Sequence, residues 1–402
     1  MSERFPLEEL RDLLNKAKEM DANCKQFGAN AHKYQWNPPA SLEEVEDFEQ
    51  KIGVRLPKEY RSFLLLAGNG GAGPYYGLFS LQEVLYWLED DMDLKKEPVL
   101  YPGIEIPQED YEEEELDAEE YDCEHMIEDA EQENEPESEE ESWLQGCIPI
   151  GSQGDSYFMY LLLSGPNEGR VVYVESELTY VFFPREQGFL AWYKRWLREI
   201  SGGYRIFWFG TNLDGDENEL RACYKNTADK DEKRLILSSM KKFPSLSAAS
   251  KAWIAEAAQE YIQEPDARWL LDLLQTAGAK EPDAFLEQRW ELGLYDGIIL
   301  EIYYVLHHCR KEDEEETSAF LEHWGKRIMK VLPQISQGHW YIAFETFKKC
   351  SWLKLRDAAG LLEIADKKVR PELLRTFGAF PDAAQNLNLF LKELEERENL
   401  EF

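Results

Sequence analysis

The sequence predicts an α+β N-terminal domain, in which helices flank a mainly antiparallel sheet, followed by an all-α C-terminal domain. Three observations favour this fold class. Apolar runs rich in aromatic and β-branched residues, typical of strands, occupy 156–163, 170–175 and 179–183, with turn residues between them. Segments with helical apolar periodicity lie on both sides of these runs. From Asp229 onward nearly every segment has that helical periodicity.

Capping residues mark the helices expected before the sheet. Ser41 and Glu44 have the spacing of a capping box, in which each side chain satisfies a free backbone N–H of the first turn. Gly53 can adopt the left-handed conformation that ends this helix, and Pro57 is a favourable first-turn residue for the next. The glycine-rich segment 68–71 ends that second helix. The elements expected in this region are helices at 7–20, 41–52, 57–67 and 81–88 and a short strand at 75–81.

The glycine cluster does not have the pattern of a phosphate-binding loop. Such a loop follows a strand and leads into Gly-Lys-Ser/Thr at the start of a helix. Here a helix is expected before the glycines, and Ala72, Gly73 and Pro74 follow them without a lysine. The favoured interpretation is a tight turn into a strand.

After a helix expected at 189–200, the segment 204–209 is a candidate last strand and 211–218 is a polar turn. Asp214 and Asp216 resemble the beginning of a calcium-binding loop, but its twelfth position is Cys223 rather than glutamate, which favours an ordinary loop.

The remaining chain is expected to be helical, with short breaks that contain proline or glycine. Such breaks are typical of antiparallel neighbours, and an irregular helical repeat and a helical bundle both fit the pattern. Domains are therefore expected at 1–203 and 204–402. The expected helices are Lys230–Phe243, Ser247–Gln263, Asp266–Thr276, Pro282–Gly293, Gly297–Cys309, Thr317–Val331, Trp340–Cys350, Leu355–Asp366, Pro371–Phe377 and Asp382–Arg397.

The formal net charge of −36 limits the classes of partner. Nucleic acid and acidic membrane surfaces would be repelled, because both require a basic surface. A basic protein partner fits the charge, and the alternative is that the acidity serves only solubility. The six cysteines are scattered singly, without a zinc or disulfide pattern. Neither a signal peptide nor an apolar membrane span is evident, so a soluble cytoplasmic protein is expected.

An acidic insert is expected at about 105–143 within the N-terminal domain. Between Glu109 and Glu141 there are 20 Asp or Glu residues and no Lys or Arg, and charge repulsion disfavours a packed core there. The segment either attracts a basic partner or is a solvated insert without a partner, and its spacing lacks the order of an EF-hand. The candidate partner-binding residues are Glu112, Glu113, Glu114, Glu115, Glu119, Glu120, Glu139, Glu140 and Glu141.

No catalytic constellation is recognisable in the sequence. The zinc-protease, serine-hydrolase and deaminase motifs are absent, and adjacent His307 and His308 diverge on a helix, which makes them poor metal ligands as a pair. We therefore expect a non-enzymatic protein with no catalytic, cofactor-binding or metal-binding residues and no cofactor. An enzyme is retained only as a third, less favoured class.

One set of residues resembles a known family. The matching features are Ile52-Gly53-Val54-x-Leu56-Pro57-x-x-Tyr60-x-x-Phe63-Leu64, then Asn69-Gly70-Gly71 and Gly77, and downstream Ile148-Pro149-Ile150-Gly151 with Gly154-Asp155. This pattern resembles the SMI1/KNR4 (SUKH) superfamily over roughly residues 1–203, interrupted by the acidic insert. The C-terminal half does not match it. The residues assigned to the fold motif are Gly53, Leu56, Pro57, Tyr60, Phe63, Asn69, Gly70, Gly71, Gly77, Gly151, Gly154 and Asp155.

The resemblance implies a binding fold rather than an enzyme. Bacterial members are commonly immunity proteins that bind and neutralise toxins, often nucleases, and fungal members act as regulatory interaction proteins. In the family the Leu-Pro and glycine positions mainly build the fold, so no binding residue follows from the motif. The expected function is to bind and neutralise a bacterial toxin, and the expected partner is a basic toxin domain. The alternative is a regulatory or scaffold adaptor.

Overall fold

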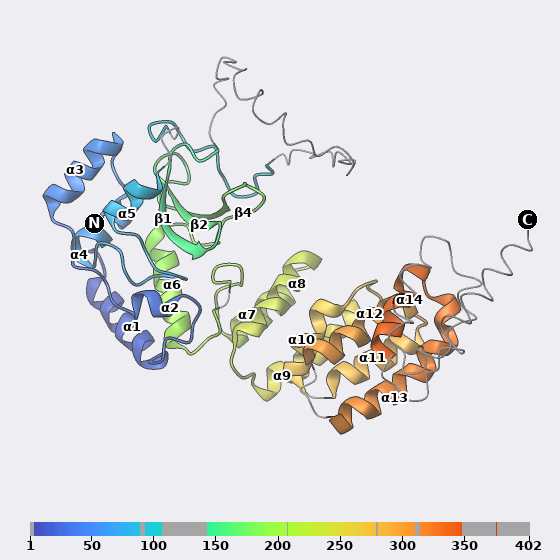
Figure 1. The fold of residues 1–402 in the computed structure, drawn as a ribbon. Coiled ribbons are helices and arrows are strands. Elements are labelled where there is room, and N and C mark those ends of the chain that lie inside the picture. The colour runs from blue at the N-terminus through green and yellow to red at the C-terminus, as the bar shows by residue number, and fades with distance from the viewer. Residues whose placement is uncertain are drawn as a thin grey trace, which may run out of the picture. The chain divides into compact units, whose positions relative to one another are not determined.

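The computed structural model describes residues 4–88, 93–106, 143–206, 208–278, 280–309, 314–347 and 375. These residues form two compact units (Figure 1). The described residues up to Asp214, together with Lys242–Pro244, form the first unit, and those at Gly215–Lys241 and from Ser245 onward form the second. The domain boundary expected after residue 203 stays a prediction.

The first unit contains a four-stranded antiparallel sheet with helices around it, which confirms the predicted fold class of this region. Each strand pairs with the next one along the chain, so β2 and β3 are the inner strands. The strands are β1 (Cys147–Gly154), β2 (Tyr157–Leu162), β3 (Val171–Glu175) and β4 (Val181–Phe182). The helices are α1 (Leu7–Met20), α2 (Ala29–His32), α3 (Leu42–Ile52), α4 (Lys58–Leu66), α5 (Leu81–Trp87) and α6 (Phe189–Ser201).

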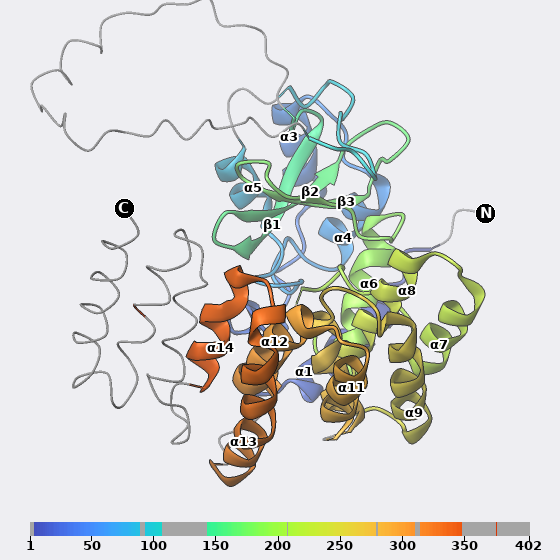
Figure 2. The same cartoon turned by 90° about the vertical axis from the view of Figure 1, so that its right-hand side faces the viewer.

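The core of the first unit lies between α6 and the elements around it. On α6, the indole nitrogen of Trp192 donates to the Tyr173 hydroxyl of β3 at 2.9 Å. The Phe63 ring of α4 lies 5.3 Å from Phe189 and 4.9 Å from Tyr193, measured between ring centroids. Helix α1 packs against α6, and α5 lies beside β1 (Figures 1 and 2). Burial of these aromatic side chains supplies much of the hydrophobic stabilisation of this unit.

The capping residues behave as the sequence predicts. The Ser41 hydroxyl accepts from the Glu44 N–H at 3.1 Å, and the Glu44 carboxylate accepts from the Ser41 N–H at 2.7 Å, which confirms the capping box of α3. Gly53 ends α3 with a φ of 71°. Pro57 lies at the N-cap of α4, one residue before the expected first turn. Leu42, the first residue of α3, is 53% exposed, whereas Val45, Phe48 and Ile52 of the same helix are buried.

Two strands expected from the sequence do not form. In place of a strand at 75–81, only Leu78 makes bridges, to Gly71 and to Gly151, because Tyr75 and Gly77 have left-handed backbones that interrupt an extended chain. The described part of 204–209 also contains no strand.

The second unit is all helical in its described residues, as predicted. Its α-helices are α7 (Glu217–Asn226), α8 (Lys230–Ser239), α9 (Ala248–Ala257), α10 (Arg268–Ala277), α11 (Glu281–Glu291), α12 (Tyr295–Tyr304), α13 (Glu314–Val331) and α14 (Trp340–Phe347). Helix α7 was missed, and part of it was expected to be a polar turn. Its N-cap is Asp216, whose carboxylate accepts from the N–H groups of Asn218 at 2.7 Å and Glu219 at 2.9 Å. The resemblance to a calcium loop therefore reflects helix capping.

Three expected helices continue in a different geometry. The chain after α8 and after α9 tightens into 3₁₀ turns at Met240–Lys242 and Ala258–Tyr261, and α12 continues as a π-helix at Val305–Cys309. The helices expected at 355–366, 371–377 and 382–397 lie outside the continuous described ranges, as do the end of the helix expected at 340–350 and the acidic segment 109–141.

A buried ion pair lies in the core of the second unit. Arg289 Nε contacts Glu301 Oε2 at 2.8 Å, and both side chains are fully buried. The guanidinium also donates to the carbonyl oxygens of Ile262 and Glu264, each at 2.8 Å. Burial raises the pKa of Glu301, and the positive charge of Arg289 opposes that rise. This pair fixes the turn after α9 against α11 and α12.

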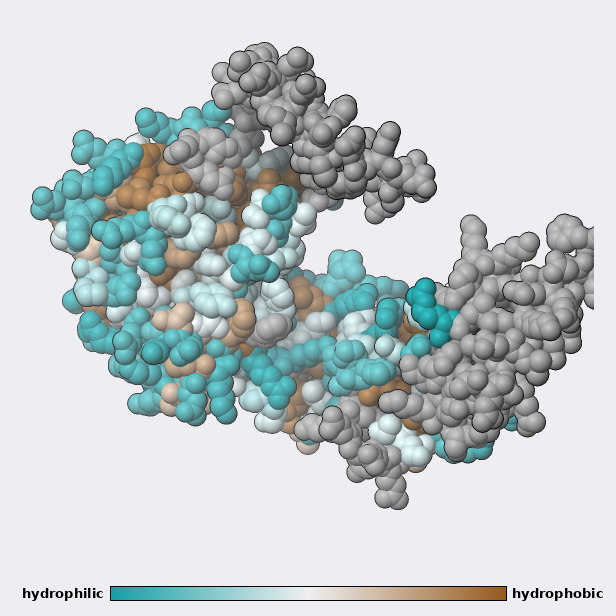
Figure 3. All heavy atoms as spheres, in the orientation of Figure 1, coloured by the Kyte–Doolittle hydropathy of each residue, from teal (hydrophilic) through white to brown (hydrophobic). Residues whose placement is uncertain are grey.

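The outer surface is largely hydrophilic where it can be seen. Figure 3 shows hydrophilic side chains over much of this face, with hydrophobic residues visible between them in smaller patches. This is the surface expected for a chain with a net charge of −36.

An aromatic pocket as the candidate functional site

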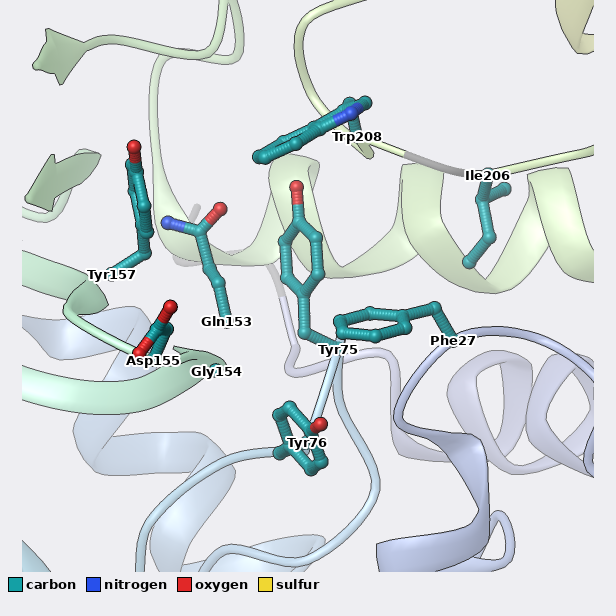
Figure 4. A pocket seen from close by; sticks show the side chains of 9 residues that line it. All are labelled: Phe27, Tyr75, Tyr76, Gln153, Gly154, Asp155, Tyr157, Ile206 and Trp208. Atoms are coloured by element: carbon teal, nitrogen blue, oxygen red, sulfur yellow. The ribbon is translucent and has the colours of Figure 1, made fainter.

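A pocket of about 330 Å³ in the first unit is lined mainly by aromatic rings (Figure 4). Five of the lining residues are Phe27, Tyr75, Tyr76, Tyr157 and Trp208, and the others are Gln153, Gly154, Asp155 and Ile206. They come from four stretches of the chain: the segment before α2, the glycine-rich loop, the turn between β1 and β2, and the segment after α6. The pocket volume lies in the range typical of sites for small ligands or single side chains.

Backbone bridges bring the glycine-rich loop to the end of β1. Leu78 bridges Gly71 on one side and Gly151 on the other. The Phe79 N–H donates to the Ile150 carbonyl at 2.8 Å, and the Tyr76 N–H donates to the Ser152 carbonyl at 3.3 Å. These bonds place Tyr75 and Tyr76 beside the turn between β1 and β2.

Two glycines of the motif permit this close approach of backbones. A Cβ added at Gly77 would lie 2.4 Å from the Gly71 carbonyl oxygen, and one added at Gly151 would lie 2.4 Å from the Gly77 carbonyl oxygen. Real Cβ atoms do not approach so closely, so a side chain at either position would separate the segments. The glycines therefore hold two walls of the pocket together.

Replacing Gly77 with alanine is expected to lower the free energy of unfolding of the first unit by about 2 kcal/mol. The alanine would combine a φ of 99° with the short contact to Gly71. Gly103 is the matched control, because its φ is 87° and no heavy atom would lie within 4 Å of an added Cβ. G103A should cost only about 1 kcal/mol, the penalty of the left-handed backbone alone. Chemical denaturation measures both variants, and equal losses would contradict the role assigned to close approach.

Three non-glycine residues of the pocket have left-handed backbones. The φ angles are 55° at Tyr75, 54° at Asp155 and 57° at Trp208. Such conformations cost free energy and persist where the surrounding structure enforces them, which is common at ligand-binding sites. Just before Asp155 the β1–β2 pairing is also irregular, with a register shift between Ser152 and Gly154. In the pocket, tertiary contacts therefore hold these three residues in backbone conformations that they would not otherwise prefer.

The polar groups of the pocket have different environments. The Tyr75 hydroxyl donates to the Phe209 carbonyl at 3.0 Å, and burial raises the pKa of Tyr75 above its usual value, which keeps the phenol neutral. The Gln153 amide donates to the Phe158 carbonyl at 3.2 Å. Asp155 is exposed and makes no ion pair with any described residue. It is the only charged side chain among the lining residues.

The structure distributes the fold-motif residues between the core and this pocket. Gly154 and Asp155 line the pocket, while Gly70, Gly71, Gly77 and Gly151 shape the backbone behind it. The remaining motif residues belong to the helical layer: Gly53 and Pro57 cap helices, Leu56, Tyr60 and Phe63 are buried, and Asn69 accepts from the Leu81 N–H. The nine candidate glutamates lie outside the described residues.

Sequence reasoning did not identify most of the pocket. Phe27 and Trp208 lie outside the recognised motif, and Tyr75 and Tyr76 were assigned to a strand. The available signal was the pair of adjacent tyrosines directly after a glycine cluster, because large aromatic residues in a surface loop often contribute to binding. The structure adds Gly28, because a Cβ there would lie 2.2 Å from the Tyr75 carbonyl, a contact that the sequence alone does not reveal.

The described residues contain no group of three or more His, Cys, Asp or Glu side chains arranged to hold a metal ion. Among the same residues, no helix combines the length and apolar character needed to cross a membrane.

Comparison with protein families finds a model that matches part of the chain. The model of the SMI1 / KNR4 family (SUKH-1) matches residues 39–195, which is less than half of the chain. The match includes the pocket residues from the glycine-rich loop and from the β1–β2 turn, and it excludes Phe27, Ile206 and Trp208. No curated protein and no solved structure matches the chain.

Proposed function

Residues 39–195 belong to the SMI1/KNR4 family (SUKH-1), and from this membership we propose that the protein binds and neutralises a toxin protein. The family consists typically of immunity proteins to polymorphic toxins and is generally non-catalytic. The single observation that carries the proposal is the family match. The pocket supports it as a binding feature, because it has aromatic walls and no cluster of catalytic side chains among its lining residues.

The proposed partner is a basic toxin domain. The chain has a formal net charge of −36, of which the segment 109–141 supplies 20 negative charges, so the remainder is also acidic. Complementary charge speeds association and excludes wrong partners. Toxins that act on nucleic acid are suitable partners, since such proteins need a basic surface of their own.

Co-expression with a toxin encoded beside the gene for this protein is expected to restore growth and to yield a complex that survives size-exclusion chromatography. A catalytically inactive toxin variant should form the same complex, which separates binding from toxicity. Growth arrest that continues despite full expression of this protein, together with the absence of a complex, would contradict the proposal.

The second unit supports a second candidate, a regulatory or scaffold adaptor. Its described residues are all helical and lie outside the family match, so they offer a separate surface for protein binding. Affinity capture that returns the same non-toxin protein with and without the toxin gene would favour this candidate over the first.

A further inference from the structure

We propose that the aromatic pocket binds the guanidinium group of an arginine side chain on the protein partner. This inference deepens the proposed function and rests on it, because it assigns the contact through which a basic partner is recognised. It concerns the pocket formed by Phe27, Tyr75, Tyr76, Tyr157 and Trp208 with Asp155.

The charge of the pocket selects a cation. Its lining residues include no Lys, Arg or His, and the Asp155 carboxylate is their single charge. This carboxylate forms no ion pair with a described residue, so an incoming cation displaces no protein partner from it. The surrounding chain is strongly acidic, which raises the local concentration of cationic groups.

The rings are arranged as walls rather than as a stack. Phe27 and Tyr76 meet at 5.4 Å between centroids with an angle of 74° between their planes, and Tyr157 and Trp208 meet at 6.3 Å with 73°. In Figure 4, the Tyr75 ring stands between Trp208 and Tyr76, and Asp155 lies near Tyr157. The faces of aromatic rings carry negative potential and attract cations, most strongly at tryptophan.

The geometry favours arginine over other side chains. A guanidinium is planar, so it can stack on a ring while its N–H groups pair with a carboxylate. A lysine ammonium is not planar and lacks the paired N–H donors of a guanidinium, and it is more strongly hydrated. An apolar side chain would gain burial but would remove water from the Asp155 carboxylate without giving it a partner, which costs free energy.

The pocket is also built before any partner binds. The left-handed backbones of Tyr75, Asp155 and Trp208 set the directions in which their Cα–Cβ bonds leave the chain. Tyr75 is held further by its hydrogen bond to Phe209 and by the close approach of Gly28. A preformed site loses less conformational entropy on binding, so even a single side chain can be recognised.

Titration of the full chain with the peptide Ac-Gly-Arg-Gly-NH2 tests the proposal without any toxin. We expect a saturable shift of the Trp208 indole signal in an ¹⁵N-tryptophan-labelled sample, with that signal assigned through Trp208→Phe. The same peptide with citrulline keeps the shape but lacks the charge, and we expect it to bind at least about tenfold more weakly. The lysine peptide should bind less tightly than the arginine peptide, and a phenylalanine peptide should produce no saturable shift.

Asp155→Asn is expected to weaken binding of the arginine peptide about fivefold or more, because the carboxylate contributes a charge-assisted pair. Asp12→Asn is the matched control, because Asp12 is an exposed residue of α1 that has no ion pair with described residues. Both substitutions change the net charge by the same amount. D12N should leave the affinity unchanged. Thermal unfolding of both variants checks that each remains folded.

Several outcomes would overturn the proposal: no saturable shift, equal binding of the citrulline peptide, stronger binding of the phenylalanine peptide, or equal effects of D155N and D12N. None of them depends on finding a toxin. Failure to bind a toxin with the peptide result intact would count against the proposed function alone.

Discussion

Replacing Arg195 with methionine is expected to lower the free energy of unfolding of the first unit by about 3–5 kcal/mol, because it would break a buried ion pair by removing one partner. The Arg195 side chain on α6 is 1% exposed. Its Nη1 contacts Glu186 Oε1 at 2.8 Å and its Nε contacts Glu199 Oε1 at 3.1 Å, and it also donates to the Asn212 carbonyl. Methionine preserves most of the volume and removes all of these bonds.

A second buried cation completes the cluster. Lys242 Nζ lies 3.2 Å from Glu199 Oε1 and donates to the Leu213 carbonyl at 2.6 Å. Burial lowers the pKa of Lys242, while the charge of Glu199 opposes that shift. The carboxylates of Glu186 and Glu199 balance the charges of Arg195 and Lys242, and Asp214, 4.0 Å from Arg195 Nε, pairs with the exposed Arg198. The cluster connects α6 to the chain at 212–214 and to Lys242. Loss of Arg195 would leave two buried carboxylates with one cation.

Arg198→Met is the matched control for Arg195→Met. Arg198 lies one turn along the same helix and pairs with Asp214 at 2.7 Å, but its side chain is 54% exposed. An exposed pair contributes at most about 1 kcal/mol, so R198M should change stability little. The double variant R195M/E186Q should recover part of the loss, because it neutralises a carboxylate left without its cation. Chemical denaturation measures all three variants, and equal losses for R195M and R198M would contradict this account.

The parts of the fold that depend on local chemistry could be predicted from the sequence. The helix predicted at 7–20 has those bounds in the structure, and the capping box of Ser41 and Glu44 forms as expected. The strands near 156–163 and 170–175 form and are the inner strands of the sheet. In these segments propensity, periodicity and capping all favour the same conformation.

The predictions made from the sequence are wrong where tertiary contacts override the local conformational preference of the residues. The run 204–209 has the composition of a strand, yet Trp208 has a left-handed backbone and lines the pocket. The same holds at Tyr75. The pocket could not be predicted because its walls come from four separated stretches, and only Gly154 and Asp155 belonged to a recognised motif. Arg195 and Glu199 have the spacing of a surface helix pair, and nothing in that spacing reveals that both are buried.

The first unit is expected to lose stability as the pH falls from neutrality toward 4, because of His32. This side chain is 9% exposed, and its Nδ1 accepts from the Tyr34 N–H at 3.0 Å, so the folded state holds the neutral ring. Burial lowers the pKa of His32 from 6.5 to about 4, against opposing contributions from the Tyr75 backbone and from Asp21.

The direction of this pH dependence follows from the number of protons bound by the folded and unfolded states. Between pH 6.5 and about 4, His32 binds a proton in the unfolded chain but not in the folded one. The free energy of unfolding therefore falls as the pH decreases through this window, by about 2 kcal/mol at pH 5 and about 3 kcal/mol in full. Protonation of Nδ1 would also remove the bond from Tyr34.

His32→Asn separates this effect from the titration of carboxylates. An asparagine side-chain oxygen can accept from the Tyr34 N–H but does not titrate, so the difference in unfolding free energy between pH 7 and pH 5 should shrink by about 2 kcal/mol relative to the wild type. His323→Asn is the control, because His323 is half exposed and lies in the second unit. Identical losses on acidification in wild type and H32N would contradict the assignment.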